Sequence, residues 1–179
     1  MSREIPRPRR FVIAALALIG AAVLFRAQIA QALIIRGDDY MYRGNRAAAL
    51  ERYGRALWIL PSSQTAADRY VFVSMERQTP QARHAALLVA NRYLSACPHD
   101  AVLLSDRALW YLHARRYTDA QRDFTAAADA THSVTDYLFA GYAAEHARNH
   151  RAAVRLWKSA LLARPGYRPA VIALAEHRQ

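Results

Sequence analysis

Apolar residues follow two different patterns along the chain, one before and one after about residue 30. Residues 11–25 form an apolar run without a charged side chain. Beyond this run, apolar positions recur with a helical period, and prolines and capping residues divide the chain into paired segments. The predicted pairs are 31–43 with 46–59, 64–77 with 80–96, 100–114 with 117–130, and 134–147 with 150–163, followed by a last helix at 168–178.

The predicted helix boundaries have local causes. Pro61 ends one helix, and Ser62 and Ser63 offer caps for the next one. Thr79 places a capping hydroxyl directly before Pro80, which can occupy the first position of a helix. The second part of the chain is therefore predicted to be helical throughout, with short turns.

One spacing of small and bulky residues returns four times. Its alanines stand at Ala49, Ala86, Ala120 and Ala153, separated by 37, 34 and 33 residues. An alanine at this point of the second helix lets its partner helix approach closely. A bulky residue four positions later fills the gap toward the neighbouring pair. That residue is Tyr53, Phe124 or Trp157 in three copies, but Ala90 in the second, which weakens its packing.

A period of about 34 residues with helix–turn–helix content resembles the tetratricopeptide repeat (TPR). The resemblance covers residues 30–179 and implies an all-α fold, an α-solenoid of about four helix pairs with a C-terminal capping helix. A generic helical bundle is the alternative, which the matching alanine, aromatic and proline positions of the first and fourth copies disfavour. The expected repeats are 30–63, 67–100, 101–133 and 134–167, with the cap at 168–179.

The apolar run near the N-terminus predicts a transmembrane helix at 11–29, after a basic tail at 1–10. Arg26 can snorkel to the interface, which lengthens the usable span. The basic tail predicts a cytoplasmic N-terminus and therefore a periplasmic repeat domain on a bacterial inner membrane. A cleaved signal peptide is the main alternative. A buried core helix is disfavoured because the run has no polar face.

The signal-peptide alternative places its cleavage site at Ala30-Gln31-Ala32. Cleavage there would remove residues just before Leu33, where the first repeat helix is already under way. No turn residue interrupts the helical pattern at this point. We therefore favour a retained anchor that runs directly into the first repeat.

The chain has 25 basic and 14 acidic residues, a net charge of +11. The arginines are spread over every segment and interleaved with acidic residues, so nucleic-acid binding is disfavoured. Contact with an anionic polymer or lipid headgroups remains a weaker hypothesis, which steep salt dependence would identify. Cys97 is the only cysteine, so no intrachain disulfide can form.

No motif for catalysis or cofactor binding is visible in the sequence. The chain lacks a phosphate-binding loop, a nucleophile elbow and a pair of CxxC motifs. His146 and His150 have a spacing that can serve metal binding, but they straddle a predicted turn and have no evident third ligand. We therefore expect no enzyme, no cofactor and no metal site.

The TPR resemblance implies a binding surface, because the first helix of each pair lines the concave face of such arrays. There, extended peptides or partner helices bind. This surface is apolar and aromatic with a few acidic residues, which favours an amphipathic helix or an apolar peptide carrying some positive charge. The alternative is that several of these residues belong to the core. The predicted groove residues are Asp38, Tyr42, Asp68, Val71, Phe72, Met75, Leu109, His113, Leu138, Tyr142, Glu145 and His146.

Together these features predict a non-enzymatic, membrane-anchored scaffold that binds a protein partner and helps assemble an envelope complex. The alternative is a self-assembling structural subunit. In that case the groove would receive a helix of a neighbouring copy, such as the one at 168–178.

Overall fold

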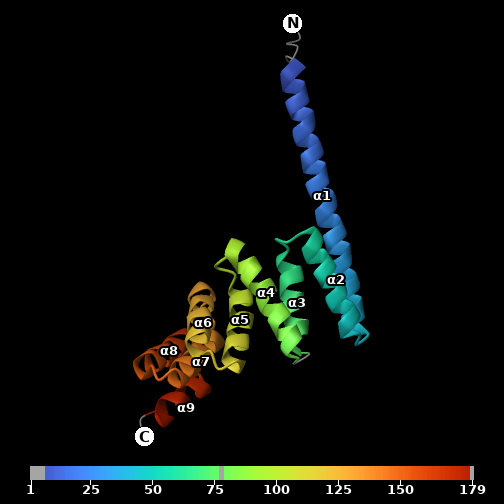
Figure 1. Ribbon diagram of the computed structural model, residues 1–179. Coiled ribbons are helices and arrows are strands. Elements are labelled where there is room, and N and C mark those ends of the chain that lie inside the picture. Colours follow the sequence, from blue (N-terminus) through green and yellow to red (C-terminus); the bar gives the residue numbers. More distant parts are fainter. Residues whose placement is uncertain (1–6, 77–78, 178–179) are drawn as a thin grey trace. The chain divides into compact units, whose positions relative to one another are not determined.

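A computed structural model describes residues 7–76 and 79–177, which form α-helices and no strand (Figure 1). The predicted all-α fold is confirmed. From residue 42 on, the helix ends agree with the prediction to within about two residues, whereas α1 begins at Arg7, four residues before the predicted span, and runs without a break into the first repeat. Residues 1–6 of the predicted tail and 178–179 of the predicted cap lie outside the described residues. The helices are α1 (Arg7–Tyr42), α2 (Arg46–Ile59), α3 (Gln64–Glu76), α4 (Pro80–Ala96), α5 (Ala101–His113), α6 (Tyr117–Thr131), α7 (Val134–His146), α8 (His150–Ala163) and α9 (Arg168–Glu176).

The chain divides into two compact units, residues 1–66 and 67–179. The boundary between the units falls between the first predicted repeat, 30–63, and the second, 67–100. The second repeat is the copy that has Ala90 where the others have an aromatic side chain. The two units are described separately below.

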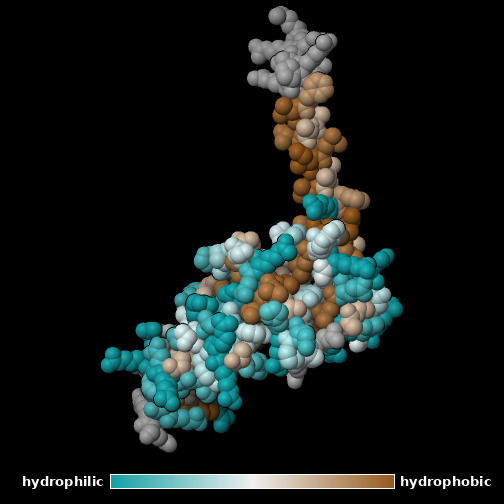
Figure 2. All heavy atoms as spheres, in the orientation of Figure 1, coloured by the Kyte–Doolittle hydropathy of each residue, from teal (hydrophilic) through white to brown (hydrophobic). Residues whose placement is uncertain are grey.

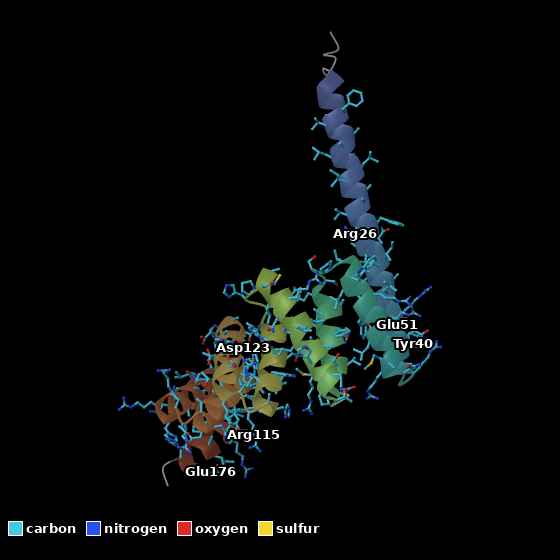
Figure 3. All side chains as sticks on the ribbon, viewed as in Figure 1. Arg26, Tyr40, Glu51, Arg115, Asp123 and Glu176 are labelled. Carbon is cyan, nitrogen blue, oxygen red and sulfur yellow. The ribbon has the colours of Figure 1, made fainter. Side chains whose placement is uncertain are left out.

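In the first unit, α1 is one continuous helix of 36 residues that joins the apolar run to the first repeat. Its stretch Phe11–Tyr42 is long and apolar enough to cross a membrane, and the most apolar part of this stretch is not buried in the protein. Figure 2 shows hydrophobic residues over the N-terminal stretch of α1, and Figure 3 places Arg26 at the lower end of this stretch. Ala30 and Ile34 are buried further along, where α2 packs on α1.

Tyr53 connects these two helices. Its ring lies so close to Gly37 that a β-carbon there would overlap it, and its hydroxyl donates a hydrogen bond to Oδ1 of Asp38 at 2.7 Å. The predicted pairing of a small residue on the first helix with a bulky one on the second is therefore present in this repeat.

The turn between the two helices of a repeat has the same backbone conformation in three repeats. The residue before the cap has a left-handed backbone, with φ of 73° at Gly44, 59° at Arg115 and 60° at Arg148. Arginine adopts this conformation at a cost that glycine avoids. In two of these turns an asparagine follows, and its side chain accepts a hydrogen bond from the new helix, Asn45 from Ala48 N and Asn149 from Ala152 N.

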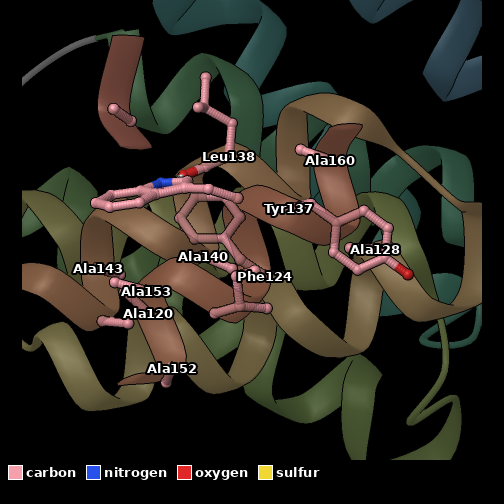
Figure 4. Packing of buried hydrophobic residues seen from close by; sticks show 14 of the residues in the cluster. Ala120, Phe124, Ala128, Tyr137, Leu138, Ala140, Ala143, Ala152, Ala153 and Ala160 are labelled. Atoms are coloured by element: carbon pink, nitrogen blue, oxygen red, sulfur yellow. Dashed lines mark hydrogen bonds between the residues drawn. The ribbon is translucent and has the colours of Figure 1, made fainter. Parts of the chain in front are cut away.

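In the second unit, the main core lies among α5–α9 and is built largely from alanine (Figure 4). Ala120 and Ala153 are fully buried, as the repeat spacing predicts, and Phe124 fills the space four positions after the first of them. Trp157 packs against Gly141, and its Nε1 donates to the carbonyl of Leu138 at 3.3 Å. In the second repeat, Ala86 and Ala90 are both buried without an aromatic neighbour at the equivalent place.

Candidate functional site

A groove of about 410 Å³ opens in the second unit, between side chains of α3, α4 and α5. Apolar and aromatic side chains dominate it, with acidic and basic groups among them. It brings together four predicted residues, one pair from α3 and one from α5. The lining residues are Phe72, Met75, Glu76, Arg83, Asp106, Leu109, Trp110 and His113.

Helical spacing explains why these residues meet. On α3, Phe72 is followed at the third and fourth positions by Met75 and Glu76, which places all three on one face. On α5, Asp106 is followed three, four and seven residues later by Leu109, Trp110 and His113. Such a row covers one stripe of a helix. The groove is therefore bounded by two stripes of first helices, with Arg83 supplied by α4.

The carboxyl groups near the groove are held in an unfavourable environment for negative charge. Burial, followed by the negative charges of Asp68, Asp100 and Asp136, raises the pKa of Asp106 to about 6. Burial and the charge of Asp100 raise the pKa of Asp68 to about 6, although Arg69 partly offsets them. This part of a strongly cationic chain is consequently acidic.

Two buried polar atoms in this region lack a hydrogen-bond partner among the described residues. One is Nε1 of Trp110, in the lining of the groove, and the other is Oδ1 of Asp68. A buried donor without an acceptor costs about 1–3 kcal/mol. The groove thus offers the indole donor of Trp110 and the carboxyl group of Asp106 amid apolar side chains, with Asp68 nearby, and a ligand that carries both an acceptor and a cation would match it.

A second hollow of about 330 Å³ shares Arg83, Trp110 and His113 with the groove. Pro80 and His84 extend its lining to the first turn of α4. The shared residues make the two hollows parts of one surface. A bound segment could therefore extend past Trp110.

Two of the predicted groove residues are wrong, because they belong to the core. Val71 is 1% exposed and Leu138 is 6% exposed. Val71 precedes Phe72, and neighbouring residues of a helix point about 100° apart, so only one of the two can face the groove. Leu138 lies in the main core cluster, and its backbone carbonyl accepts the bond from Trp157.

The remaining predicted residues lie outside the groove. Asp38 accepts the hydrogen bond from Tyr53, and Tyr42 is exposed at the end of α1. Tyr142 makes an edge-on contact with Trp157, their ring centroids 5.7 Å apart. His146 stacks on Tyr117 with centroids 4.9 Å apart, and Asp68 acts on the groove through its charge.

Asp106 and Trp110 are not among the predicted groove residues, although both share the α5 stripe with Leu109 and His113. The helical spacing alone could have identified them. It could not have identified Arg83, because α4 is a second helix and its arginine reaches the groove only through tertiary packing.

Glu145, the last predicted groove residue, belongs to a different cluster. Its Oε1 lies 2.9 Å from Nδ1 of His150, and its Oε2 lies 3.3 Å from Nδ1 of His177. Hydrogen bonding to His150 lowers the pKa of Glu145, and burial opposes this effect. His177 follows α9, far along the chain from the other two residues.

No protein-family model matches the sequence, and no curated protein matches it. Several solved structures match its fold. One is MamA, with a TM-score of 0.71, 13% identity, and 79% of this chain and 81% of that chain covered. Another is PilF from Pseudomonas aeruginosa, with a TM-score of 0.67 and 20% identity; the match covers 85% of this chain and 68% of PilF. A third is a tetratricopeptide repeat protein from Parabacteroides merdae, with a TM-score of 0.70 and 17% identity; the match covers 84% of this chain and 60% of that protein.

The chain has the fold of a tetratricopeptide repeat protein. At these identities the likeness shows the TPR architecture and not a shared partner. In TPR terms, α3 and α5 are the first helices of the second and third repeats, so the groove lies between two first helices.

Proposed function

We propose that the protein is a non-enzymatic, membrane-anchored TPR scaffold that binds a protein partner in the groove between α3 and α5. The observation that carries this proposal is the groove itself, which combines apolar walls with the half-buried carboxyl group of Asp106. Phe72, at 51% exposure, presents an aromatic surface that no part of the described core covers.

The chemistry of the groove defines the partner segment. Phe72, Met75 and Leu109 supply apolar surface for apolar anchors. The negative charges of Asp68, Asp100 and Asp136 act on Asp106, so a lysine or arginine of the partner would relieve the repulsion. Trp110 Nε1 would donate to an oxygen atom of the partner. An amphipathic helix or a short apolar peptide with one basic residue fits this set.

The N-terminal helix supports attachment to a membrane. Apolar side chains such as Phe11 and Leu18 are exposed over the first turns of α1. Basic residues before the run favour a cytoplasmic N-terminus and hence a periplasmic TPR domain on a bacterial inner membrane. Ala30 is 1% exposed, so cleavage at the signal-peptide site would remove part of the packing of the first repeat. This favours a retained anchor.

Site-specific photocrosslinking of the full-length protein in its own membranes tests the proposal. A photoreactive phenylalanine analogue replaces Phe72, and the matched control places it at Leu88, which is 57% exposed on α4 and belongs neither to the groove nor to the second hollow beside it. We expect one partner segment, apolar and containing a lysine or arginine, to crosslink from position 72 and not from position 88. Equal crosslinking at both positions, or none at 72, would contradict a binding groove.

Self-assembly is the second candidate, and α9 is the observation that favours it. This terminal helix exposes Val171 and Ile172 beside Arg168, the combination of apolar and basic groups that the groove requires. If α9 of a neighbouring copy is the occupant, the crosslinked peptide from position 72 comes from residues 168–177 of the protein itself. An Arg168→Glu substitution would then reduce the oligomer to monomers in sedimentation velocity.

A further inference from the structure

Three potential metal ligands from separate segments meet at the C-terminal end of the repeats. Glu145 stands in the last turn of α7, His150 is the first residue of α8, and His177 follows α9. One ligand atom from each lies within 4.8 Å of the other two. We propose that Glu145, His150 and His177 bind a divalent transition metal ion of the Zn²⁺ class, a function separate from the groove.

The geometry of the cluster matches the size of such an ion. Zinc binds imidazole nitrogen and carboxylate oxygen at about 2.0–2.2 Å. Tetrahedral ligand atoms at that distance are about 3.4 Å from one another. The Glu145 oxygens lie 2.9 Å and 3.3 Å from the Nδ1 atoms of His150 and His177. Small side-chain adjustments would therefore bring all three to one ion.

An unsatisfied oxygen provides independent support. Oε2 of Glu145 is shielded from solvent and has no well-aligned hydrogen-bond donor among the described residues. Nδ1 of His177 lies 3.3 Å away, too poorly aligned for more than a weak hydrogen bond. A buried carboxylate oxygen without a well-aligned donor is costly, and a cation would remove that cost.

The donor set defines the class of metal. Two imidazoles and one carboxylate suit zinc, nickel or copper, whereas magnesium and calcium prefer oxygen ligands. Three protein ligands leave a fourth position for water. The ring of Trp157, 6.0 Å from that of His177 between centroids, gives the cluster an aromatic neighbour.

The site would have a structural effect, because it links the terminal helix to the last repeat. A metal held by Glu145, His150 and His177 would tie the end of α9 to the turn between α7 and α8. Binding to the folded state alone would stabilise that state. The metal is therefore expected to protect the C-terminal cap in particular.

Zinc titration of the full-length protein tests the site. The protein is purified in detergent with a tag that contains no histidine, stripped with a chelator and titrated with ZnCl₂ by calorimetry. We expect one saturable site per chain, a higher melting temperature with zinc, and no such shift with MgCl₂. Cobalt in place of zinc should give the visible absorption of a tetrahedral ion.

Variants identify the ligands. His177→Ala and the near-isosteric Glu145→Gln should each weaken zinc binding by at least about tenfold, since even outer-shell changes typically cost 10–100-fold. His146→Ala is the matched control, because it lies beside Glu145 but stacks on Tyr117, and it should bind zinc like the original protein. Absence of saturable binding, or undiminished binding in folded Glu145→Gln and His177→Ala, would overturn the proposal.

Discussion

Gly141 of α7 lies against the indole ring of Trp157, so closely that a β-carbon at position 141 would overlap the ring. The indole nitrogen is also anchored, since it donates to the carbonyl of Leu138. Gly37 and Tyr53 repeat this relationship in the first repeat. A missing side chain on the first helix is therefore what admits the aromatic ring of the second.

Substitutions at this contact should destabilise the second unit. Gly141→Ala forces the indole out of place and should cost about 1–3 kcal/mol, the usual range for overpacking. Trp157→Ala removes a large buried side chain and should cost about 3–5 kcal/mol. Chemical denaturation monitored by circular dichroism measures both. Gly20→Ala is the control, since a β-carbon there meets no atom within 4 Å. Equal stability of Gly141→Ala and Gly20→Ala would show that the contact is not tight.

A buried ion pair connects α5 and α6. Asp123 is 2% exposed, its Oδ2 lies 2.6 Å from Nε of Arg107, and its Oδ1 lies 3.2 Å from Nε of Arg122 (Figure 3 labels Asp123). Asp123→Ala would leave Arg107 without its buried partner, and removal of one member of such a pair typically costs about 3–5 kcal/mol.

The matched control for Asp123 is Asp119, one turn earlier on α6. It pairs with Arg116, whose side chain is half exposed, so Asp119→Ala should cost less than about 1 kcal/mol. Urea denaturation of both variants gives the comparison. If both variants lost a similar free energy of unfolding, the Asp123 ion pair would contribute no more to stability than a surface pair.

The repeat architecture was predictable because its causes are local. Thr79 and Asp100 cap the helices that they precede, and their side chains accept hydrogen bonds from Ala82 N and Leu103 N. A capping residue indicates the start of a helix from the local sequence alone, because it bonds to a backbone N–H only two or three residues later. The small-and-bulky spacing also depends only on positions within one repeat, which is why it identified Trp157 correctly.

The candidate groove was harder to predict, because its lining depends on how each helix is rotated about its own axis. α3 is apolar on more than one side, so Val71 and Phe72 are equally plausible groove residues until tertiary packing buries the first. The metal cluster needs His177 next to His150, and no sequence spacing relates residues from α8 and the end of α9. Such contacts arise from tertiary packing and are visible only in the structure.

Phe72 should contribute to partner binding but little to folding. Phe72→Ala removes an exposed ring, so the melting temperature should stay close to that of the original protein. Affinity for the crosslinked segment, made as a synthetic peptide, should fall by about 2 kcal/mol or more if Phe72 is an aromatic hot spot. Leu88→Ala should change neither quantity. A large drop in melting temperature for Phe72→Ala would place its ring in the core instead.

Asp106 should make partner binding and stability respond to pH in opposite directions. Its pKa is about 6 in the folded protein, against 3.8 for an ordinary aspartate, because burial and neighbouring carboxylates disfavour its charge. The folded state therefore binds the proton more tightly than the unfolded state. That contribution to stability is fully present below about pH 4 and is lost as the pH rises through about 6.

Partner binding should follow the opposite course, because a basic residue is attracted only by the ionised carboxylate. Affinity for the peptide should rise between pH 5 and pH 7.5. At pH 7.5, Asp106→Asn should weaken binding by about tenfold, equivalent to 1.4 kcal/mol, yet raise the melting temperature. At pH 4 the stability difference should disappear. Glu76 and His113 line the same groove and Asp68 acts on it through its charge, so the pH profile of Asp106→Asn is the background that is subtracted from the profile of the original protein. If Asp106→Asn weakened binding and also lowered stability at pH 7.5, the carboxylate would be a structural group and not one held unpaired for a partner.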